Sequence, residues 1–341
     1  EPRPGPPRSD PFEPSAGSLS DPAGGFVLEG RGAMSGVPAP NATVYATGGG
    51  VYGLRLDDGA MVEAGLRGRV KMERRTGDKV VIGDRVYAVR SEGAWSVDSV
   101  APRDSEVVRR GPGGRAAKVV AANVDRVFAV VAAREPDMTF SLVDRLLVIA
   151  EASGLHSVLV VNKVDLEGGA ERAAEAERIY GPLGYRVVAV SAALGTGMDR
   201  LRSEMCRGVS ALMGPSGAGK SSLLNALHPA LDLRTADVSR KTARGRHTTV
   251  SSRLIPLECG GVVADTPGFG DVGLWGVASD EVAACFPEIA ALEEECRFRG
   301  CSHLREPDCA VLLAVAEGTI APTRYESYVR LREEAAEAGP R

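Results

Sequence analysis

The segment from Gly214 to Ser221 constrains the fold of this chain more than any other. It reads Gly-Pro-Ser-Gly-Ala-Gly-Lys-Ser and fits the pattern G-x-x-x-x-G-K-[ST] at every fixed position. An apolar run, 209–213, precedes it, and a segment with helical character, 222–227, follows it. This strand–loop–helix context predicts a phosphate-binding loop in a parallel α/β fold, because glycines let backbone N–H groups wrap a phosphate at a helix N-terminus.

The residues of this loop have separate expected roles. The Lys220 ammonium is expected to reach the β- and γ-phosphates of a nucleotide, and the Ser221 hydroxyl to bind Mg²⁺. Backbone N–H groups supply the remaining phosphate contacts. The candidate nucleotide-binding residues here are Gly214, Pro215, Ser216, Gly217, Ala218, Gly219, Lys220, Ser221 and Ser222.

Two motifs that precede this loop are suited to recognise a guanine base. In Asn162-Lys163-Val164-Asp165, which follows an apolar run, the Asp165 carboxylate can accept hydrogen bonds from guanine N1–H and the N2 amine. Adenine lacks this donor pattern and would leave the carboxylate unpaired. Ser191-Ala192 follows another apolar run, and the Ala192 N–H is expected to meet the guanine carbonyl. An ATP-dependent kinase is the alternative, and it requires that Asp165 does not read the base.

Two segments after the loop complete the expected site. Asp265-Thr266-Pro267-Gly268 follows an apolar run, and its aspartate is expected to hold Mg²⁺ through water, while the Gly268 N–H senses the γ-phosphate. A basic segment, 240–249, lies between this motif and the loop. Either Thr248 or Thr249 is the candidate threonine that reaches Mg²⁺, and the residues alone do not decide between them.

The order of these motifs indicates a rearranged domain. In ordinary GTPases the phosphate loop comes first and N-K-x-D last, whereas here N-K-x-D precedes the loop. We therefore expect a circularly permuted domain, in which every loop still emerges from the carboxyl end of a strand at one edge of the sheet. Since the Asp265 motif leads directly into the C-terminal region, we infer that the state of the nucleotide is transmitted there.

A cluster of cysteines near the C-terminus is suited to hold a metal. The spacing Cys296-x4-Cys301-x-His303-x5-Cys309 supplies three thiolates and one imidazole, a tetrahedral set for Zn²⁺. Four protein ligands leave no open position, so the predicted site is structural. Six cysteines in 341 residues are too sparse for a disulfide scaffold, and the cluster indicates a reducing compartment. The remaining cysteines are expected to be plain thiols: Cys206, Cys259 and Cys285.

The first third of the chain divides into two parts. Nine of its 21 prolines lie in the first 40 residues, which contain few large apolar side chains, so we expect a disordered tail over residues 1–41. Residues 42–110 alternate in about five short strands with tight turns, one of them expected over 66–71. This pattern predicts a small β-barrel of the OB type, although alternation alone does not distinguish it from an SH3-like barrel. By analogy with other OB barrels, we expect an RNA-binding domain here.

The rest of the chain is predicted to form two further domains. Residues 111–278 alternate apolar runs with helical segments, among them 140–152, which indicates an α/β domain with a parallel sheet. Residues 279–341 are expected to form a helical zinc-binding domain, closed by an amphipathic helix over 323–336.

Hydropathy argues against a membrane protein, and the distribution of charge leaves RNA binding open. No run approaches the roughly 18 apolar residues of a membrane helix, so no membrane partner is expected. The net charge is −4, from 41 basic and 45 acidic residues, so RNA binding would depend on local clusters. Two such clusters are candidates for phosphate contacts, one comprising Arg240, Lys241, Arg244, Arg246 and Arg253, and the other Arg67, Arg69, Lys71, Arg74 and Arg75.

Together these features resemble the RsgA (YjeQ) family of small-ribosomal-subunit GTPases over about residues 42–335. The residues that carry the resemblance are the permuted motifs, the segment Arg244-Gly245-Arg246-His247-Thr248-Thr249 and the C-x4-C-x-H-x5-C cluster. The resemblance implies an enzyme that hydrolyses GTP to GDP and phosphate with Mg²⁺, carries one structural Zn²⁺, and binds the small (30S) subunit and its rRNA late in maturation. It also implies that the subunit stimulates hydrolysis. We expect a cytoplasmic monomer.

One catalytic position departs from Ras-like enzymes. These place a glutamine just after D-x-x-G to orient the attacking water, whereas this chain has Phe269 there. His247 is the candidate replacement, as the resemblance also suggests, and with Lys220 and Thr249 it completes the expected catalytic set. The alternative is that His247 contacts only RNA or solvent. Two other functions stay open: a GTP-gated RNA adaptor, and a permuted GTPase that acts on the large subunit.

Overall fold

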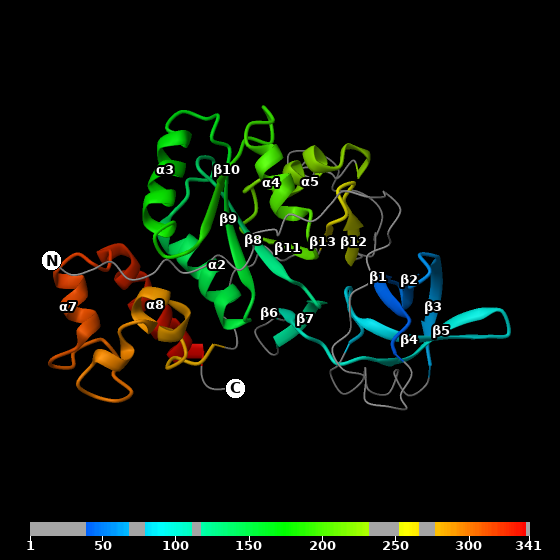
Figure 1. Cartoon of the computed structure of the whole chain (residues 1–341), viewed down its shortest axis with the longest axis horizontal. Helices are drawn as coiled ribbons and strands as arrows, with labels where there is room; N and C mark the ends of the chain where they lie inside the picture. Colours follow the sequence, from blue (N-terminus) through cyan, green and yellow to red (C-terminus); the bar gives the residue numbers. More distant parts are fainter. Residues whose placement is uncertain (1–38, 68–78, 111–116, 232–251, 266–276, 339–341) are drawn as a thin grey trace, which may run out of the picture. The chain divides into compact units, whose positions relative to one another are not determined.

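One continuous sheet of eleven strands runs through the described part of this computed structural model, which comprises residues 39–67, 79–110, 117–231, 252–265 and 277–338 (Figure 1). From edge to edge its strands are β10 (Arg186–Ala189), β9 (His156–Asn162), β8 (Arg126–Ala132), β11 (Val209–Met213), β13 (Val262–Asp265), β12 (Ser252–Pro256), β1 (Ala42–Gly48), β2 (Val51–Leu56), β3 (Met61–Leu66), β5 (Ala94–Val100) and β4 (Arg85–Ser91). In this order β12 of the α/β domain pairs with β1 of the barrel, so backbone hydrogen bonds between these two strands join the two domains.

The first five strands form the predicted OB-like barrel. Strand β1 pairs with both β2 and β4, and β3 pairs with β5, which closes the sheet on itself. Fully buried side chains at alternate positions fill it, among them Val44, Leu54 and Val97. The sequence analysis did not predict β3, and the strand that it predicted over 66–71 meets β3 only at Leu66, because residues 68–71 lie outside the described ranges. The inward-facing residues of β3 include a small alanine, which weakens the apolar pattern.

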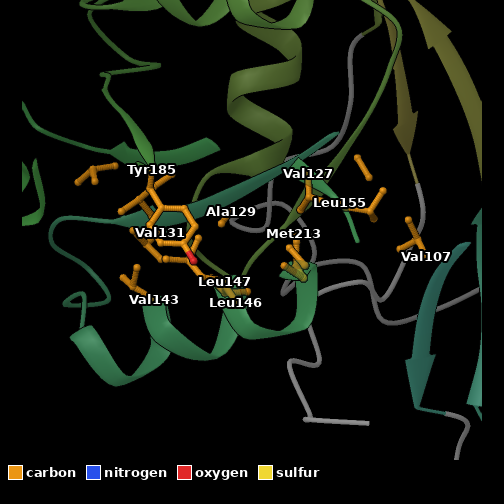
Figure 2. Close-up of a cluster of buried hydrophobic side chains, with 14 of the residues drawn as sticks. Val107, Val127, Ala129, Val131, Val143, Leu146, Leu147, Leu155, Tyr185 and Met213 are labelled. Atoms are coloured by element: carbon orange, nitrogen blue, oxygen red, sulfur yellow. The ribbon is translucent and has the colours of Figure 1, made fainter. Parts of the chain in front are cut away.

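The α/β domain is built on five parallel strands, β10, β9, β8, β11 and β13, with β12 antiparallel at their edge. Strand β8 is buried on both faces, which explains its unbroken apolar run. Val127, Ala129 and Val131 pack on one face with α2 (Phe140–Ala152), as Figure 2 shows. Phe128 and its neighbour Val130 pack on the other.

The remaining helices cover the two faces of this sheet. The helix predicted over 140–152 is confirmed as α2, and the Thr139 side chain caps its first turn. Helix α3 contributes to the same apolar cluster as α2, whereas α4 and α5 contribute to the opposite one. These helices are α3 (Gly169–Tyr180), α4 (Met198–Met205) and α5 (Lys220–Leu227), and a 3₁₀ turn follows at Pro229–Leu231. Within the described ranges, no helix combines the length and apolarity needed to cross a membrane.

A two-stranded hairpin that the sequence analysis did not predict links the barrel to the α/β domain. It consists of β6 (Glu106–Arg110) and β7 (Ala117–Ala122), and the predicted domain boundary at residue 110 falls inside it. The Ala122 N–H donates to Ile82 O at 2.9 Å, which attaches the hairpin to the barrel.

The C-terminal domain is helical and has its own apolar core. Its elements are α6 (Pro287–Ala290), α7 (Ala310–Ala316), α8 (Pro322–Ala338) and 3₁₀ turns at Ala283–Cys285 and Glu293–Glu295. The closing helix predicted over 323–336 is confirmed as α8. Arg324 of α8, 1% exposed, donates to Asp144 of α2 at 2.7 Å and to both carboxylate oxygens of Glu288 at 2.6 and 3.0 Å. A buried ion network therefore joins this domain to α2.

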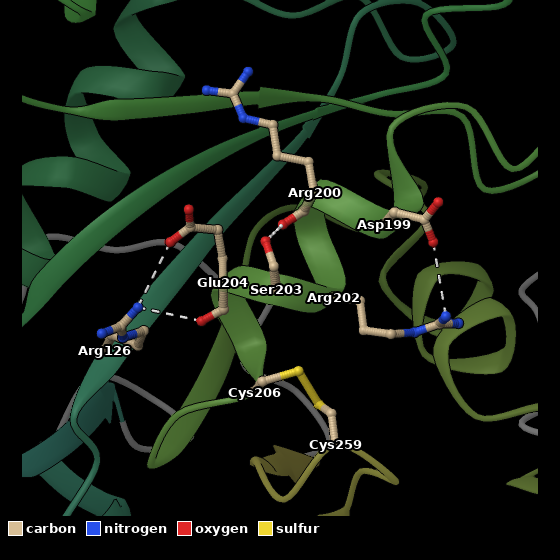
Figure 3. The surroundings of a disulfide bond; sticks show 8 residues. All are labelled: Arg126, Asp199, Arg200, Arg202, Ser203, Glu204, Cys206 and Cys259. Carbon is tan, nitrogen blue, oxygen red and sulfur yellow. Dashed lines mark hydrogen bonds and ion pairs between the residues drawn. A yellow bond between two sulfur atoms is a disulfide. The ribbon is translucent and has the colours of Figure 1, made fainter. Parts of the chain in front are cut away.

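Two cysteines expected to be plain thiols form a disulfide instead. Cys206 at the end of α4 and Cys259 in the β12–β13 turn are bonded, with Cα atoms 5.2 Å apart (Figure 3). Their separation of 53 residues hides this proximity in the sequence. Both lie just before the adjacent parallel strands β11 and β13, which bring them together. Cys285 remains a free buried thiol, as expected.

Candidate nucleotide-binding site and metal centre

Four parallel strands each end in one of the predicted motifs. Strand β9 ends at Asn162, β11 leads into Gly214, β10 leads toward Ser191, and β13 ends at Asp265. Because these strands run parallel in one sheet, their carboxyl ends lie at the same edge. The permuted order of the motifs therefore leaves the site at one place in the fold.

Asn162 joins three of these motifs through its buried side chain. Its Nδ2 donates to Ala218 O of the phosphate loop at 3.0 Å, and its Oδ1 accepts from the Ala192 N–H at 3.2 Å. The residue is 1% exposed, so both bonds are shielded from water. In this structure the Ala192 N–H is thus bonded to Asn162, and its contact with a guanine carbonyl stays a prediction.

Two glycines of the loop are required by close packing. Gly214 has φ +150°, and an added Cβ would overlap Val130 O. Gly219 has φ +90°, and its Cβ would overlap Asn162 Nδ2, the atom that donates to Ala218. Side chains rarely adopt this backbone region, so both steric space and conformation select glycine.

Lys220 folds back onto the backbone of its own loop. Its Nζ donates to Gly214 O at 2.6 Å and to Pro215 O at 2.8 Å. Burial lowers the pKa of this ammonium group. A bound phosphate would offer a charged acceptor in place of these two carbonyls, which is the role predicted for Lys220.

The base-reading motif presents one exposed carboxylate. Asp165 is exposed, and its side chain makes no hydrogen bond among the described residues. Ser191 is fully buried, and its Oγ accepts from the Leu194 N–H at 3.0 Å, which shapes the turn before Ala192. Asp165 is therefore the group of this motif that is available to a ligand.

The sequence analysis did not identify the loop after β8 as part of the site. Lys163 Nζ donates to Glu135 O, and Pro136 Cδ lies 3.2 Å from the position of a Cβ on Gly217. This loop thus contacts both the base-reading motif and the phosphate loop. The available signal was that β8, like its neighbours, ends at the same edge of the sheet.

Ser221 and Asp265 are suited to a magnesium ion. Hydroxyl and carboxylate oxygens are the hard ligands that Mg²⁺ takes together with substrate phosphates. The register pairs Ala211 with Ala264, so Asp265, the last residue of β13, lies beside the end of β11, which leads to the loop. Arg253 Nε lies 3.5 Å from Asp265 Oδ2. Several predicted residues lie outside the described ranges: His247, Thr248, Thr249 and Gly268.

The four predicted zinc ligands converge. Their ligand atoms all lie within 4.8 Å of one another. Cys296 Sγ and Cys309 Sγ are 3.8 Å apart, and His303 Nδ1 lies 3.5 and 3.4 Å from them. Ligands at about 2.3 Å for sulfur and 2.0–2.1 Å for nitrogen around a tetrahedral Zn²⁺ would be separated by about 3.8 and 3.5 Å. The donor set and its spacing therefore fit a structural zinc ion.

Burial acts in opposite ways on the imidazole and the thiol of this cluster. Burial lowers the pKa of His303, which favours the neutral imidazole that ligates metals. Burial raises the pKa of the Cys301 thiol to about 12, so without a cation the thiolate is disfavoured. Among the described residues the buried His303 Nε2 has no hydrogen-bond partner, whereas Nδ1 faces the sulfurs, which favours Nδ1 as the ligand atom.

Most of the residues predicted to contact RNA lie outside the described ranges. Arg67 pairs with Asp98 at 3.0 Å, with both side chains about half exposed. Arg253 pairs with Asp265, as above. The other members of the two clusters lie outside the described ranges: Arg69, Lys71, Arg74, Arg75, Arg240, Lys241, Arg244 and Arg246.

Residues 100–275 match the model of the RsgA GTPase family. Over 291 residues the chain is 47% identical to the small ribosomal subunit biogenesis GTPase RsgA of Gemmatimonas aurantiaca, covering 84% of this chain and 94% of that protein. It is 39% identical over 289 residues to the protein of the same name from Geobacillus thermodenitrificans, with the same coverage.

Two solved structures agree with these relatives. The crystal structure of YjeQ from Thermotoga maritima is 32% identical, has a TM-score of 0.74, and aligns over 89% of this chain and 100% of its own. That of YloQ, described as a circularly permuted GTPase, is 27% identical with a TM-score of 0.69, over 89% and 97%. Since the matches span most of the chain and share its permuted order, the chain belongs to the RsgA family of circularly permuted GTPases and is a GTP hydrolase.

Proposed function

We propose that this GTPase binds the small (30S) ribosomal subunit and hydrolyses GTP as a checkpoint late in the assembly of that subunit. The observation that carries the proposal is the Asn162 side chain, which ties the base-reading motifs to the phosphate loop in one buried network. The names of the relatives, small ribosomal subunit biogenesis GTPases, support the choice of partner.

The residues have the following proposed roles in nucleotide binding. The Asp165 carboxylate accepts from guanine N1–H and the N2 amine, and residues 214–222 surround the phosphates. Ser221 and Asp265, with Thr248 or Thr249, hold the magnesium ion. When bound, Mg²⁺ neutralises charge on the β- and γ-phosphate oxygens, and the Gly268 N–H senses the γ-phosphate.

Hydrolysis requires that a water attacks the γ-phosphorus. The new P–O bond forms as the bond to the bridging oxygen breaks, so GDP leaves with that oxygen and the water supplies the fourth oxygen of phosphate. We assign the orientation of this water to His247, since Phe269 has no polar group to do so. Lys220 stabilises charge on the phosphates, and Thr249, or Thr248 in its place, acts with it at the metal.

The two outer domains are proposed to bind the subunit. The barrel supplies basic residues for rRNA phosphates, and one structural Zn²⁺ holds the C-terminal domain in shape. The protein acts as a monomer in the cytoplasm. Because α8 is joined to α2 by the buried Arg324 network, binding by the C-terminal domain has a physical route to the nucleotide site.

The test is GTP hydrolysis by the purified protein alone, with small subunits, and with large subunits. We expect slow turnover alone and at least a tenfold stimulation by small subunits only. Turnover that neither subunit changes would favour a GTP-gated RNA adaptor, and stimulation by large subunits would replace the proposed partner. Competition with ATP checks the base: ATP in excess should leave GTP binding unchanged.

The role of His247 is tested in the same assay. His247→Ala should keep its affinity for GTP and lose subunit-stimulated turnover. Stimulated turnover at the wild-type rate would remove His247 from the mechanism and leave it as an RNA or solvent contact.

A further inference from the structure

Arg253 is placed to act on the proposed metal ligand Asp265. The two residues are directly opposite in the antiparallel register of β12 and β13. Directly opposite residues project from the same face of a sheet, so the two side chains meet. The Arg253 Nε lies 3.5 Å from the Asp265 Oδ2, and the side chains are 42% and 29% exposed. A cation thus stands beside the carboxylate that is expected to serve Mg²⁺.

The backbone holds this arrangement in place. Strand β12 pairs with β13 from Arg253 to Pro256 on one edge, and with β1 of the barrel on the other, where Arg253 is opposite Ala46. A strand paired on both edges cannot slide without breaking ladder hydrogen bonds. The guanidinium can therefore leave Asp265 only by rotation of its own long side chain.

We propose that Arg253 competes with Mg²⁺ for Asp265 and thereby raises the Mg²⁺ concentration that tight nucleotide binding requires. A guanidinium close to this carboxylate weakens its binding of a divalent cation, because the two positive charges repel each other. Arg253 would pair with Asp265 when the metal is absent and rotate away when Mg²⁺ arrives with the nucleotide. This assigns Arg253 to the metal site, where the sequence analysis had placed it among RNA contacts.

The inference rests on the proposed metal ligands, and the experiment separates the two. The affinity for a fluorescent GDP is measured against free Mg²⁺, and the midpoint is the Mg²⁺ concentration at which half of the gain in affinity has occurred. Asp265→Asn should raise this midpoint. If Asp265→Asn leaves it unchanged, the ligand assignment itself is wrong.

Arg253→Gln tests the competition. A partly exposed ion pair contributes less than a factor of about ten, so the midpoint should fall by about two- to fivefold, while the affinity in EDTA stays at the wild-type value. Arg253→Lys, which keeps a cation beside Asp265, should stay near the wild-type midpoint. A midpoint that rises in Arg253→Gln would show that Arg253 supports the metal-bound state. An unchanged midpoint would show that the Arg253–Asp265 ion pair has no effect on Mg²⁺ binding. Either result overturns the inference.

The matched control is Arg202→Gln. Arg202 forms a comparable exposed pair with Asp199 on α4, at 3.8 Å. Removing its charge should leave the Mg²⁺ midpoint unchanged, because Asp199 belongs to none of the nucleotide motifs. Circular dichroism spectra of all four variants check that the fold is kept.

Discussion

Asn162 Nδ2 donates to Ala218 O across a sequence separation of 56 residues, and this bond joins the base-reading strand to the phosphate loop. The same side chain accepts from the Ala192 N–H. Gly219 leaves the space that Asn162 occupies, so the glycine of the loop and the asparagine of N-K-x-D depend on each other. Base recognition and phosphate binding are therefore parts of one structure.

Asn162→Ala should weaken GDP binding strongly. It removes two buried hydrogen bonds and leaves Ala218 O without its donor, at a cost of about 2–3 kcal/mol or roughly 30- to 150-fold in affinity. Titration with a fluorescent GDP measures the change. Asn123→Ala is the matched control: Asn123 also bonds two backbone groups, Gly83 O and the Asp104 N–H, but near the barrel. That variant should lose stability and keep its affinity for GDP; equal losses of affinity in both would contradict the linking role of Asn162.

Arg324→Met should destabilise the protein by about 3–5 kcal/mol. The change leaves Asp144 and Glu288 buried without their common cation, which costs more than the pair itself contributes. Arg145→Met is the control, because Arg145 pairs with Glu334 where both side chains are partly exposed, and it should cost about 1 kcal/mol or less. Urea denaturation monitored by circular dichroism compares them. Equal losses would mean that burial of the Arg324 network has no special energetic weight.

Helices and strands with a clear pattern of apolar residues were predictable from the sequence. Strand β11, helix α2 and helix α8 occur where apolar runs or helical spacing placed them, since a doubly buried strand and an amphipathic helix leave clear patterns. The four zinc ligands converge as their spacing indicated. In these cases the pattern itself carries the information about burial or chemistry.

Contacts between distant segments were not predictable. The Cys206–Cys259 bond and the pair Arg253–Asp265 depend on which strands are neighbours, and a pattern within one segment does not contain that order. The contact of Pro136 with the phosphate loop depends on the same order. Strand β3 was not predicted because Ala64 and Gly65 weaken its apolar alternation.

The disulfide predicts a thiol count and a stability difference. Denatured but unreduced protein should expose four thiols, because two of its six cysteines are bonded. By the loop-entropy model, a bond that closes a loop of this size contributes about 4 kcal/mol. Cys259→Ser should therefore unfold at lower urea, whereas Cys285→Ser, the control, should keep the disulfide. A count of six thiols in protein purified without reductant would contradict the bond.

Removal of the proposed zinc ion should unfold the C-terminal domain and spare the barrel. The apolar residues of this domain surround Cys301 and Cys309, so loss of the ion leaves buried thiols that no longer hold the chain together. We expect a chelator to expose the backbone amides of residues 296–309 to hydrogen exchange while β1–β5 stay protected. His303→Ala should have the same effect without a chelator. Unchanged protection in both cases would mean that packing alone holds the domain.

Glu306 should make the free energy of unfolding depend on pH in the acidic range. Its carboxylate accepts from the N–H groups of Ser302, Leu304 and Arg305 at 2.8, 3.0 and 3.1 Å. Hydrogen bonding with the Ser302 side chain, together with these backbone bonds, holds its pKa well below the usual range. A pKa that is lower in the folded state means that the stabilisation is fully present above the unfolded value, about 4.3, and is lost as the pH falls further. The free energy of unfolding of the wild type should thus fall more steeply below about pH 4.5 than that of Glu306→Gln, which cannot titrate there. Parallel curves from urea denaturation at pH 3 to 6 would show that Glu306 does not contribute in this way.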